Sequence, residues 1–277
     1  MYRMPVSKEA QPEVKISSEY ELCVKTPQES KACYITGMVL LSPSKLILAD
    51  NRNSSIKMVD LNNSSIADRL PLDTQPWDIT LVTGDLLAVT LPNKASVQFM
   101  SVSSNKLSLG ETLKVDGRCH GISYFQEKLV LTRSYPGKQC LQFIDLKGMV
   151  LKKYIKISDS EMPCNVTSNN HYIYVSDAEG AVLRLDGEGE QIGGKYDGLN
   201  QPRSLATLED EESILVCEYG NGKIQNISCD LTRASAWLEG LTSPWGICWC
   251  GTSRKLYVSY AKNDETYDNV VHIYKKL

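Results

Sequence analysis

Three consecutive segments decide the fold: PWDITLV at residues 76–82, LLAVTLP at 86–92 and SVQFMSV at 96–102. Each is short, rich in β-branched and aliphatic residues, and separated from the next by turn-forming residues, a pattern typical of β-strands. A fourth segment of the same kind lies around residues 109–115. Together they predict a four-stranded antiparallel unit of roughly 40 residues.

The same unit recurs along the chain. CHGISYF, KLVLTRS, CLQFIDL and VLKKYIKI begin at residues 119, 128, 140 and 150, and further units open at residues 34, 163, 202 and 244. Six units of this length predict an all-β chain folded as a six-bladed β-propeller with four strands in each blade. No helical spacing of apolar residues competes with this interpretation.

The last unit ends after its third strand. An open ring would expose two sheet edges, so we expect an N-terminal strand, EVKIS from residue 13 or YELCVK from residue 20, to complete the last blade. The predicted organisation is a flexible segment at residues 1–12 followed by one propeller at residues 13–277.

Composition excludes several classes of function. Hydrophobic residues make up 42% and charged residues 23% of the 277, as in soluble globular proteins, and no apolar run is long enough to cross a membrane. A net charge of −3 argues against DNA binding. Nine cysteines without a C-x-x-C pair, beside three histidines, predict reduced thiols in a cytoplasmic protein with no metal and no cofactor.

The segment LILADNRNSSIKMVDL at residues 46–61 resembles the core of an NHL repeat, and Pro-Trp-Asp at residue 76 and Pro-Trp-Gly at residue 244 look like the openings of such blades. The phrase VTLPNK at residue 89 is similar to the C-terminal propellers of tripartite-motif proteins, especially invertebrate ones. The resemblance implies partner or substrate recognition for a ubiquitin ligase. The RING finger that carries ligase activity in that family has no counterpart in this sequence, so we expect no enzyme activity.

Two sets of loops of a propeller open on one face around its central channel, where ligands usually bind. Aromatic residues beside Arg and Asn are typical of recognition surfaces. The residues expected there are Trp77, Asp78, His120, Arg133, Asn165, Arg203, Glu218, Tyr219, Trp245 and Tyr260. Trp77 and Trp245 could instead pack as core between blades. Arg203 is expected either to be exposed at this mouth or to pair with a carboxylate such as Glu218.

A protein or small-molecule ligand on this mouth face is the first functional hypothesis. RNA binding is the alternative, with Arg203 among the cations and Trp77 or Tyr219 stacking on bases, although acidic residues on the same rim oppose phosphate. A calcium-dependent lactonase or phosphoesterase is a weaker hypothesis. Asp78, Asn165 and Glu218 could supply oxygen ligands, but their neighbours offer too few of the six to eight that calcium needs.

Overall fold

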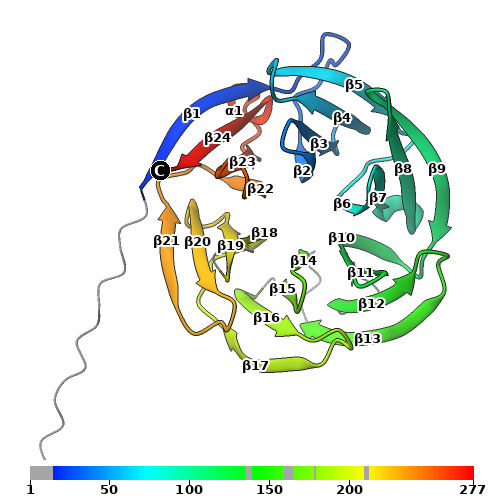
Figure 1. Cartoon of the computed structure of the whole chain (residues 1–277), viewed down its shortest axis with the longest axis vertical. Coiled ribbons are helices and arrows are strands. Elements are labelled where there is room, and N and C mark those ends of the chain that lie inside the picture. Colours follow the sequence, from blue (N-terminus) through cyan, green and yellow to red (C-terminus); the bar gives the residue numbers. More distant parts are fainter. Residues whose placement is uncertain (1–14, 135–138, 159–164, 178, 209–211) are drawn as a thin grey trace, which may run out of the picture.

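Six four-stranded antiparallel sheets surround a central channel in a ring (Figure 1). The structure is a computed structural model, and the part that it describes excludes residues 1–14, 135–138, 159–164, 178 and 209–211. The predicted all-β, six-bladed propeller is confirmed. The segment at residues 1–12, expected to be flexible, lies outside the described residues.

Each blade runs from an inner strand beside the channel to an outer strand. Blade one is β2 (Ile35–Ser42), β3 (Lys45–Asp50), β4 (Ser55–Asp60) and β5 (Ser65–Pro71), and blade two is β6 (Ile79–Thr83), β7 (Leu86–Leu91), β8 (Ser96–Ser103) and β9 (Lys106–Lys114). Blade three is β10 (Arg118–Phe125), β11 (Lys128–Ser134), β12 (Gln139–Asp145) and β13 (Val150–Ser158), and blade four is β14 (Val166–Ser168), β15 (Ile173–Asp177), β16 (Ala181–Leu185) and β17 (Gln191–Tyr196). Blade five is β18 (Pro202–Leu208), β19 (Ser213–Glu218), β20 (Lys223–Ser228) and β21 (Ala234–Leu238).

Blade six joins the two ends of the described chain. It comprises β22 (Pro244–Cys250), β23 (Lys255–Tyr260), β24 (Val270–Lys276) and, on the outside, β1 (Ile16–Cys23). β1 pairs antiparallel with β24, from Ile16 opposite Lys276 to Cys23 opposite Val270. The predicted closure by an N-terminal strand is therefore confirmed, and β1 draws on both of the candidate segments.

Helices are minor elements of the described chain. A 3₁₀ turn, η1 (Pro92–Lys94), joins β7 to β8, and α1 (Glu265–Asp268) precedes β24. Within the residues that the structure describes, no helix is long and apolar enough to cross a membrane.

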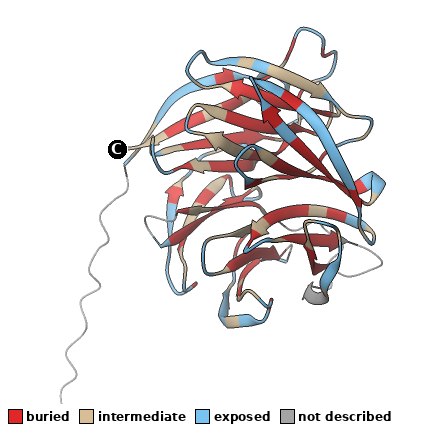
Figure 2. Cartoon of the chain, turned by 45° about the vertical axis from the view of Figure 1, so that its right-hand side comes forward, coloured by how far each residue is buried: buried red, intermediate tan, exposed pale blue. Residues whose placement is uncertain are grey.

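The core lies between neighbouring blades. Ile47 and Met58 of blade one pack with Leu87 and Met100 of blade two, and equivalent apolar clusters recur around the ring. Buried residues fill the inner and middle strands, whereas exposed residues gather on outer strands and loops (Figure 2). Because the apolar faces are used between blades, the inner strands can present polar side chains to the channel.

Hydroxyl groups connect neighbouring blades at one end of the channel. Thr90 Oγ1 accepts a hydrogen bond from the Asp78 N–H at 3.0 Å and lies 2.6 Å from the His120 carbonyl oxygen of the next blade, to which it can donate. Ser259 Oγ likewise accepts from the Gly246 N–H at 3.0 Å and donates to the Ile35 carbonyl at 2.9 Å. These contacts fix the inner strands where the candidate site begins.

Candidate functional site at the channel mouth

Five half-buried rings from five blades meet at one mouth of the channel, and we call them the mouth ring: Tyr34, Trp77, His120, Tyr219 and Trp245. The centroids of Trp77 and Trp245 are 6.3 Å apart, and Tyr34 lies 6.4 Å from Trp77 and 5.2 Å from Trp245. His120 is 5.0 Å from Trp77, and Tyr219 is 5.7 Å from Trp245. All five contacts are edge-to-face, the geometry that aromatic pairs favour. The mouth is therefore covered by a continuous aromatic surface that remains partly exposed.

Arg203 joins this surface as a cation, as does Arg52, whose guanidinium carbon lies 5.6 Å from the Tyr34 ring centroid. The guanidinium carbon of Arg203 lies 4.9 Å from the Trp245 ring centroid and 5.5 Å from that of Tyr219, so the side chain is held by cation–π contacts. Its hydrogen-bonding contact is a long one of 3.5 Å to Gln201 Oε1, and its Nε is buried without a partner. Among the described residues, no carboxylate lies within ion-pair distance of Arg203. Burial lowers the pKa of Arg203 from its ordinary high value.

Glu218 does not pair with Arg203. Its side chain is 1% exposed, and Oε2 accepts hydrogen bonds from the Asn200 N–H at 2.8 Å and from Asn221 Nδ2 at 2.9 Å. Glu218 therefore fixes the turn after β19. Of the two alternatives for Arg203, the structure places the guanidinium at the mouth.

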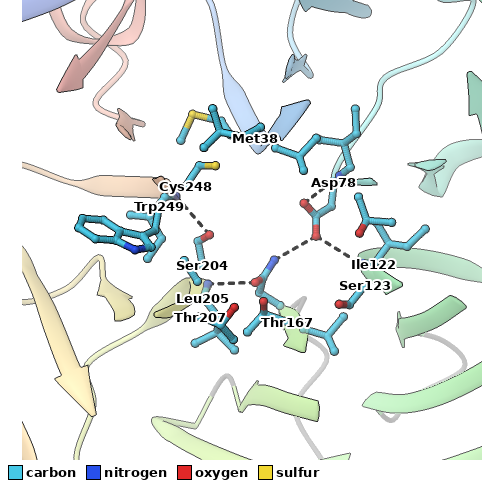
Figure 3. Close-up of a pocket in the computed structure, with 18 residues that line it drawn as sticks. Met38, Asp78, Ile122, Ser123, Thr167, Ser204, Leu205, Thr207, Cys248 and Trp249 are labelled. Carbon is cyan, nitrogen blue, oxygen red and sulfur yellow. Dashed lines mark hydrogen bonds between the residues drawn. The ribbon is translucent and has the colours of Figure 1, made fainter. Parts of the chain in front are cut away.

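Below the mouth ring, Asp78 connects three blades across the channel (Figure 3). Its carboxylate accepts hydrogen bonds from the N–H groups of Ile79 at 2.9 Å and Ile122 at 3.1 Å, and from Asn165 Nδ2 at 3.1 Å. A Cβ at Gly37 would lie 2.7 Å from Asp78 Oδ1 and 2.8 Å from its Cα, so only glycine leaves room on the adjacent strand. Burial raises the pKa of Asp78 to about 7, against the lowering effect of these three donors.

The chain of hydrogen bonds continues through blades four to six. Asn165 Oδ1 accepts from the Leu205 N–H at 3.0 Å, and Ser204 Oγ accepts from the Ile247 N–H at 3.2 Å (Figure 3). Asp78, Asn165 and Ser204, which we call the channel network, thus use their oxygen atoms to hold inner strands together. Calcium would have to displace several of these N–H donors, and Glu218 is committed elsewhere, so the residues weighed as calcium ligands do not form a preformed cage.

The raised pKa of Asp78 predicts a pH dependence of stability. Its value of about 7 lies above the ordinary 3.8, so only the folded state retains the proton between about pH 4 and about pH 7. The free energy of unfolding should therefore fall as the pH rises through this window and level off above it. We expect denaturant titrations at about pH 5 and about pH 8 to show a smaller fall for Asp78→Asn than for the unmodified chain. An equal fall in both proteins would contradict the raised pKa.

The channel below the mouth ring contains a cavity of about 250 Å³. Its wall combines hydroxyl groups with apolar side chains, and among its members are Met38, Thr80, Ser123, Thr167, Thr207, Cys248 and Trp249 (Figure 3). Pockets for drug-sized ligands occupy about 300–1,000 Å³. The cavity suits ordered water or a very small molecule, so a larger ligand at this end of the channel would bind on the mouth ring.

Four of the residues predicted at the mouth are buried: Asp78 and Glu218, whose contacts are given above, and Arg133 and Tyr260. Tyr260 is 3% exposed, with its hydroxyl 2.9 Å from that of Tyr274, and Arg133 is 4% exposed. Tyr260 ends β23 and Arg133 is the last but one residue of β11, and a residue at this end of the second strand is buried in all six blades. The expectation that Arg133 and Tyr260 face a ligand is corrected, because both side chains are buried, and we leave them out of the proposed surface.

Tyr34 belongs to the mouth ring and was missed by sequence reasoning. Judged by their pairing with the second strand, Ile35, Thr36 and Gly37 of blade one hold the positions that Pro76, Trp77 and Asp78 hold in blade two. Tyr34 therefore lies one residue before the repeated positions. It comes from the loop before β2, where its N–H donates to Asp50 Oδ1 at 3.0 Å. The sequence signal that could have identified Tyr34 is an aromatic residue directly before the first strand of a blade.

Comparisons with known proteins match the fold. No model of a known protein family matches this chain, and neither does the sequence of any curated protein. The solved structure of virginiamycin B lyase from Staphylococcus aureus is 12% identical, with a TM-score of 0.65 over 95% of this chain and 100% of that one. A streptogramin B lyase gives 12% and 0.66 over 95% and 98% of the two chains. A Bacteroides thetaiotaomicron protein of unknown function gives 10% and 0.70 over 94% and 75%. Such likenesses show a shared six-bladed propeller and leave the NHL resemblance unconfirmed.

Proposed function

We propose that this chain is a non-catalytic binding module that recognises a protein or small-molecule ligand on the mouth ring. The observation that carries the proposal is the partly exposed aromatic surface with Arg203 held at its edge. Tyr, Trp and Arg are the residue types enriched among interface residues that contribute most to binding energy. Their side chains are already ordered by mutual contacts, which lowers the entropic cost of binding.

A binding role is favoured over catalysis by the state of the nearby titratable groups. Burial, with a smaller contribution from Arg118, lowers the pKa of His120 to about 4, so it is a weak base at neutral pH. The Asp78 oxygens are occupied by N–H donors. Two of the similar structures are lyases, and at 12% identity that activity does not transfer to this chain.

More specifically, we propose that the chain is the cytoplasmic substrate-recognition propeller of a tripartite-motif-like ubiquitin ligase. This proposal is supported by the NHL-like segment at residues 46–61. The eight described cysteines are free thiols, which suits a reducing compartment. RNA is a weaker candidate, because a phosphate backbone requires a track of cations.

The proposal is tested by selecting binders from a displayed random-peptide library on the immobilised chain and measuring the affinity of a selected peptide for mouth variants. We expect Trp77→Ala and Trp245→Ala each to lose about 1 to 4 kcal/mol of binding free energy, as truncated interface anchors do. Tyr172→Ala is the matched control. Tyr172 is also a half-buried ring, 4.8 Å from the guanidinium of Arg184, but it lies in the turn between β14 and β15 at the opposite end of the propeller.

Denaturant midpoints measured in parallel separate binding from folding. If the two tryptophans acted only as core, their variants would lose about 3 to 5 kcal/mol of stability and would bind normally whenever folded. Unchanged affinity in both folded variants would remove the site from the mouth ring.

A further inference from the structure

Among the described residues, no carboxylate compensates the charge of Arg203 beside the mouth ring. Its guanidinium is flanked by Trp245 and Tyr219, its Nε is buried without a partner, and no described carboxylate pairs with it. A partly desolvated cation without a counter-charge is unfavourable unless a ligand supplies one. The planar fork of a guanidinium suits an anion that can accept two parallel hydrogen bonds.

Five acidic groups on and around this face are engaged elsewhere. Asp73 pairs with Lys94, Glu239 lies 2.7 Å from Lys223, and Asp268 lies 3.5 Å from Arg52. Asp78 and Glu218 are hydrogen-bonded below the surface. Several described loop charges therefore cancel in pairs, whereas Arg203 has no described counter-charge.

A single cation without a described acidic partner favours a ligand with one negative group. RNA presents a phosphate at every nucleotide and is bound through a line of lysines and arginines. Arg52 and Lys94, which lie around this face, already have acidic partners. A peptide with one carboxylate beside an apolar or aromatic residue matches both the charge and the aromatic surface.

We propose that Arg203 recognises a carboxylate of a peptide segment in the partner, with the adjoining side chain of that segment resting on Trp245 and Tyr219. This inference rests on the proposed function, since it specifies the ligand of the same site. The carboxylate belongs either to an Asp or Glu side chain or to the chain end.

Selected peptides from a displayed random library provide the test, followed by a double-mutant cycle on synthetic peptides. We expect the selected sequences to be enriched in Asp or Glu, or to require a free C-terminus. Replacing the acidic residue by its amide, or amidating the chain end, identifies which carboxylate is used and should weaken binding 10- to 100-fold. Arg203→Gln should weaken binding of the parent peptide similarly and should cause little further loss with the neutral peptide.

Arg184→Gln is the matched control, because Arg184 also stacks on a tyrosine but at the opposite end of the propeller, and it should leave the affinity unchanged. Peptides that lose affinity in Trp245→Ala yet show no carboxylate requirement would overturn this inference and leave the proposed site standing. Peptides that bind both tryptophan variants normally would overturn the proposed site itself. The peptide-side substitutions give a result even if Arg203→Gln does not fold.

Discussion

Removing residues 1–25 should leave a chain that no longer folds cooperatively at ordinary temperature. The deletion takes away β1 and thereby exposes the edge of β24 along its whole length. Leu22 and Val24, 1% and 0% exposed, are lost with it. Burial of two such side chains contributes about 3 to 6 kcal/mol, which is a large part of the 5–15 kcal/mol that typically separates folded from unfolded domains.

Thermal unfolding followed by circular dichroism measures the effect. A shorter deletion that ends before Lys15 keeps β1 and should melt like the intact chain. If the long deletion also melted like the intact chain, ring closure by β1 would not stabilise the propeller.

The second large effect is expected at Lys57, which is fully buried in blade one. Its ammonium group lies 2.7 Å from Asp50 Oδ2, 2.7 Å from Glu29 Oε2 and 2.7 Å from the Val24 carbonyl oxygen. These partners hold the ammonium charged and raise the pKa of Lys57, despite the opposing effect of burial. Arg69 supplies a second cation to Glu29, with Nε 2.9 Å from Oε1. The cluster clamps the segment that follows β1 onto the first blade.

Lys57→Met removes the charge and nearly preserves the volume, leaving Asp50 and Glu29 without their shared cation. Breaking a buried ion pair in this way costs about 3 to 5 kcal/mol, and we expect a loss of that size in the free energy of unfolding from urea titration. Lys106→Ala is the control, since Lys106 is largely exposed and pairs with Asp68 at the surface. A Lys57→Met protein as stable as the parent would show that the cluster contributes nothing to closure.

The number of blades could be predicted from the sequence because each unit repeats the alternation of apolar and polar residues that a half-buried strand requires. The ionic cluster could not be predicted. Lys57 meets Val24 and Glu29 only after the N-terminal strand has closed the ring, so no local spacing indicates the contact. Asp50 accepts a hydrogen bond from the Asn53 N–H in the turn after β3, as an Asp at a strand end often does, and it also accepts one from the buried ammonium group.

The sequence predicts mouth residues best where a residue both opens a blade and is of a type common at binding surfaces. Trp77, Arg203 and Trp245 open their blades and do meet at the mouth. Glu218 and Tyr260 lie at the end of a second strand, close to the mouth in sequence, yet both are buried, Glu218 against Asn200 and Asn221 and Tyr260 against Tyr274. The sequence shows which loop carries a residue, but one step along a strand reverses the direction of its side chain.

Ligands should bind on the mouth ring, and the four tryptophans allow a direct test of this. Trp77 and Trp245 lie in the ring. The Trp237 and Trp249 ring centroids are 5.4 Å from each other, and the two side chains pack between blades five and six, outside the mouth ring, with Trp249 also lining the channel cavity. Each indole N–H gives one signal in a ¹⁵N-correlated spectrum, assigned with single Trp→Phe variants. On titration with a selected peptide, we expect the Trp77 and Trp245 signals to shift and those of Trp237 and Trp249 to stay in place. Shifts confined to Trp237 and Trp249, or no shift of any indole signal at saturation, would contradict ligand binding on the mouth ring.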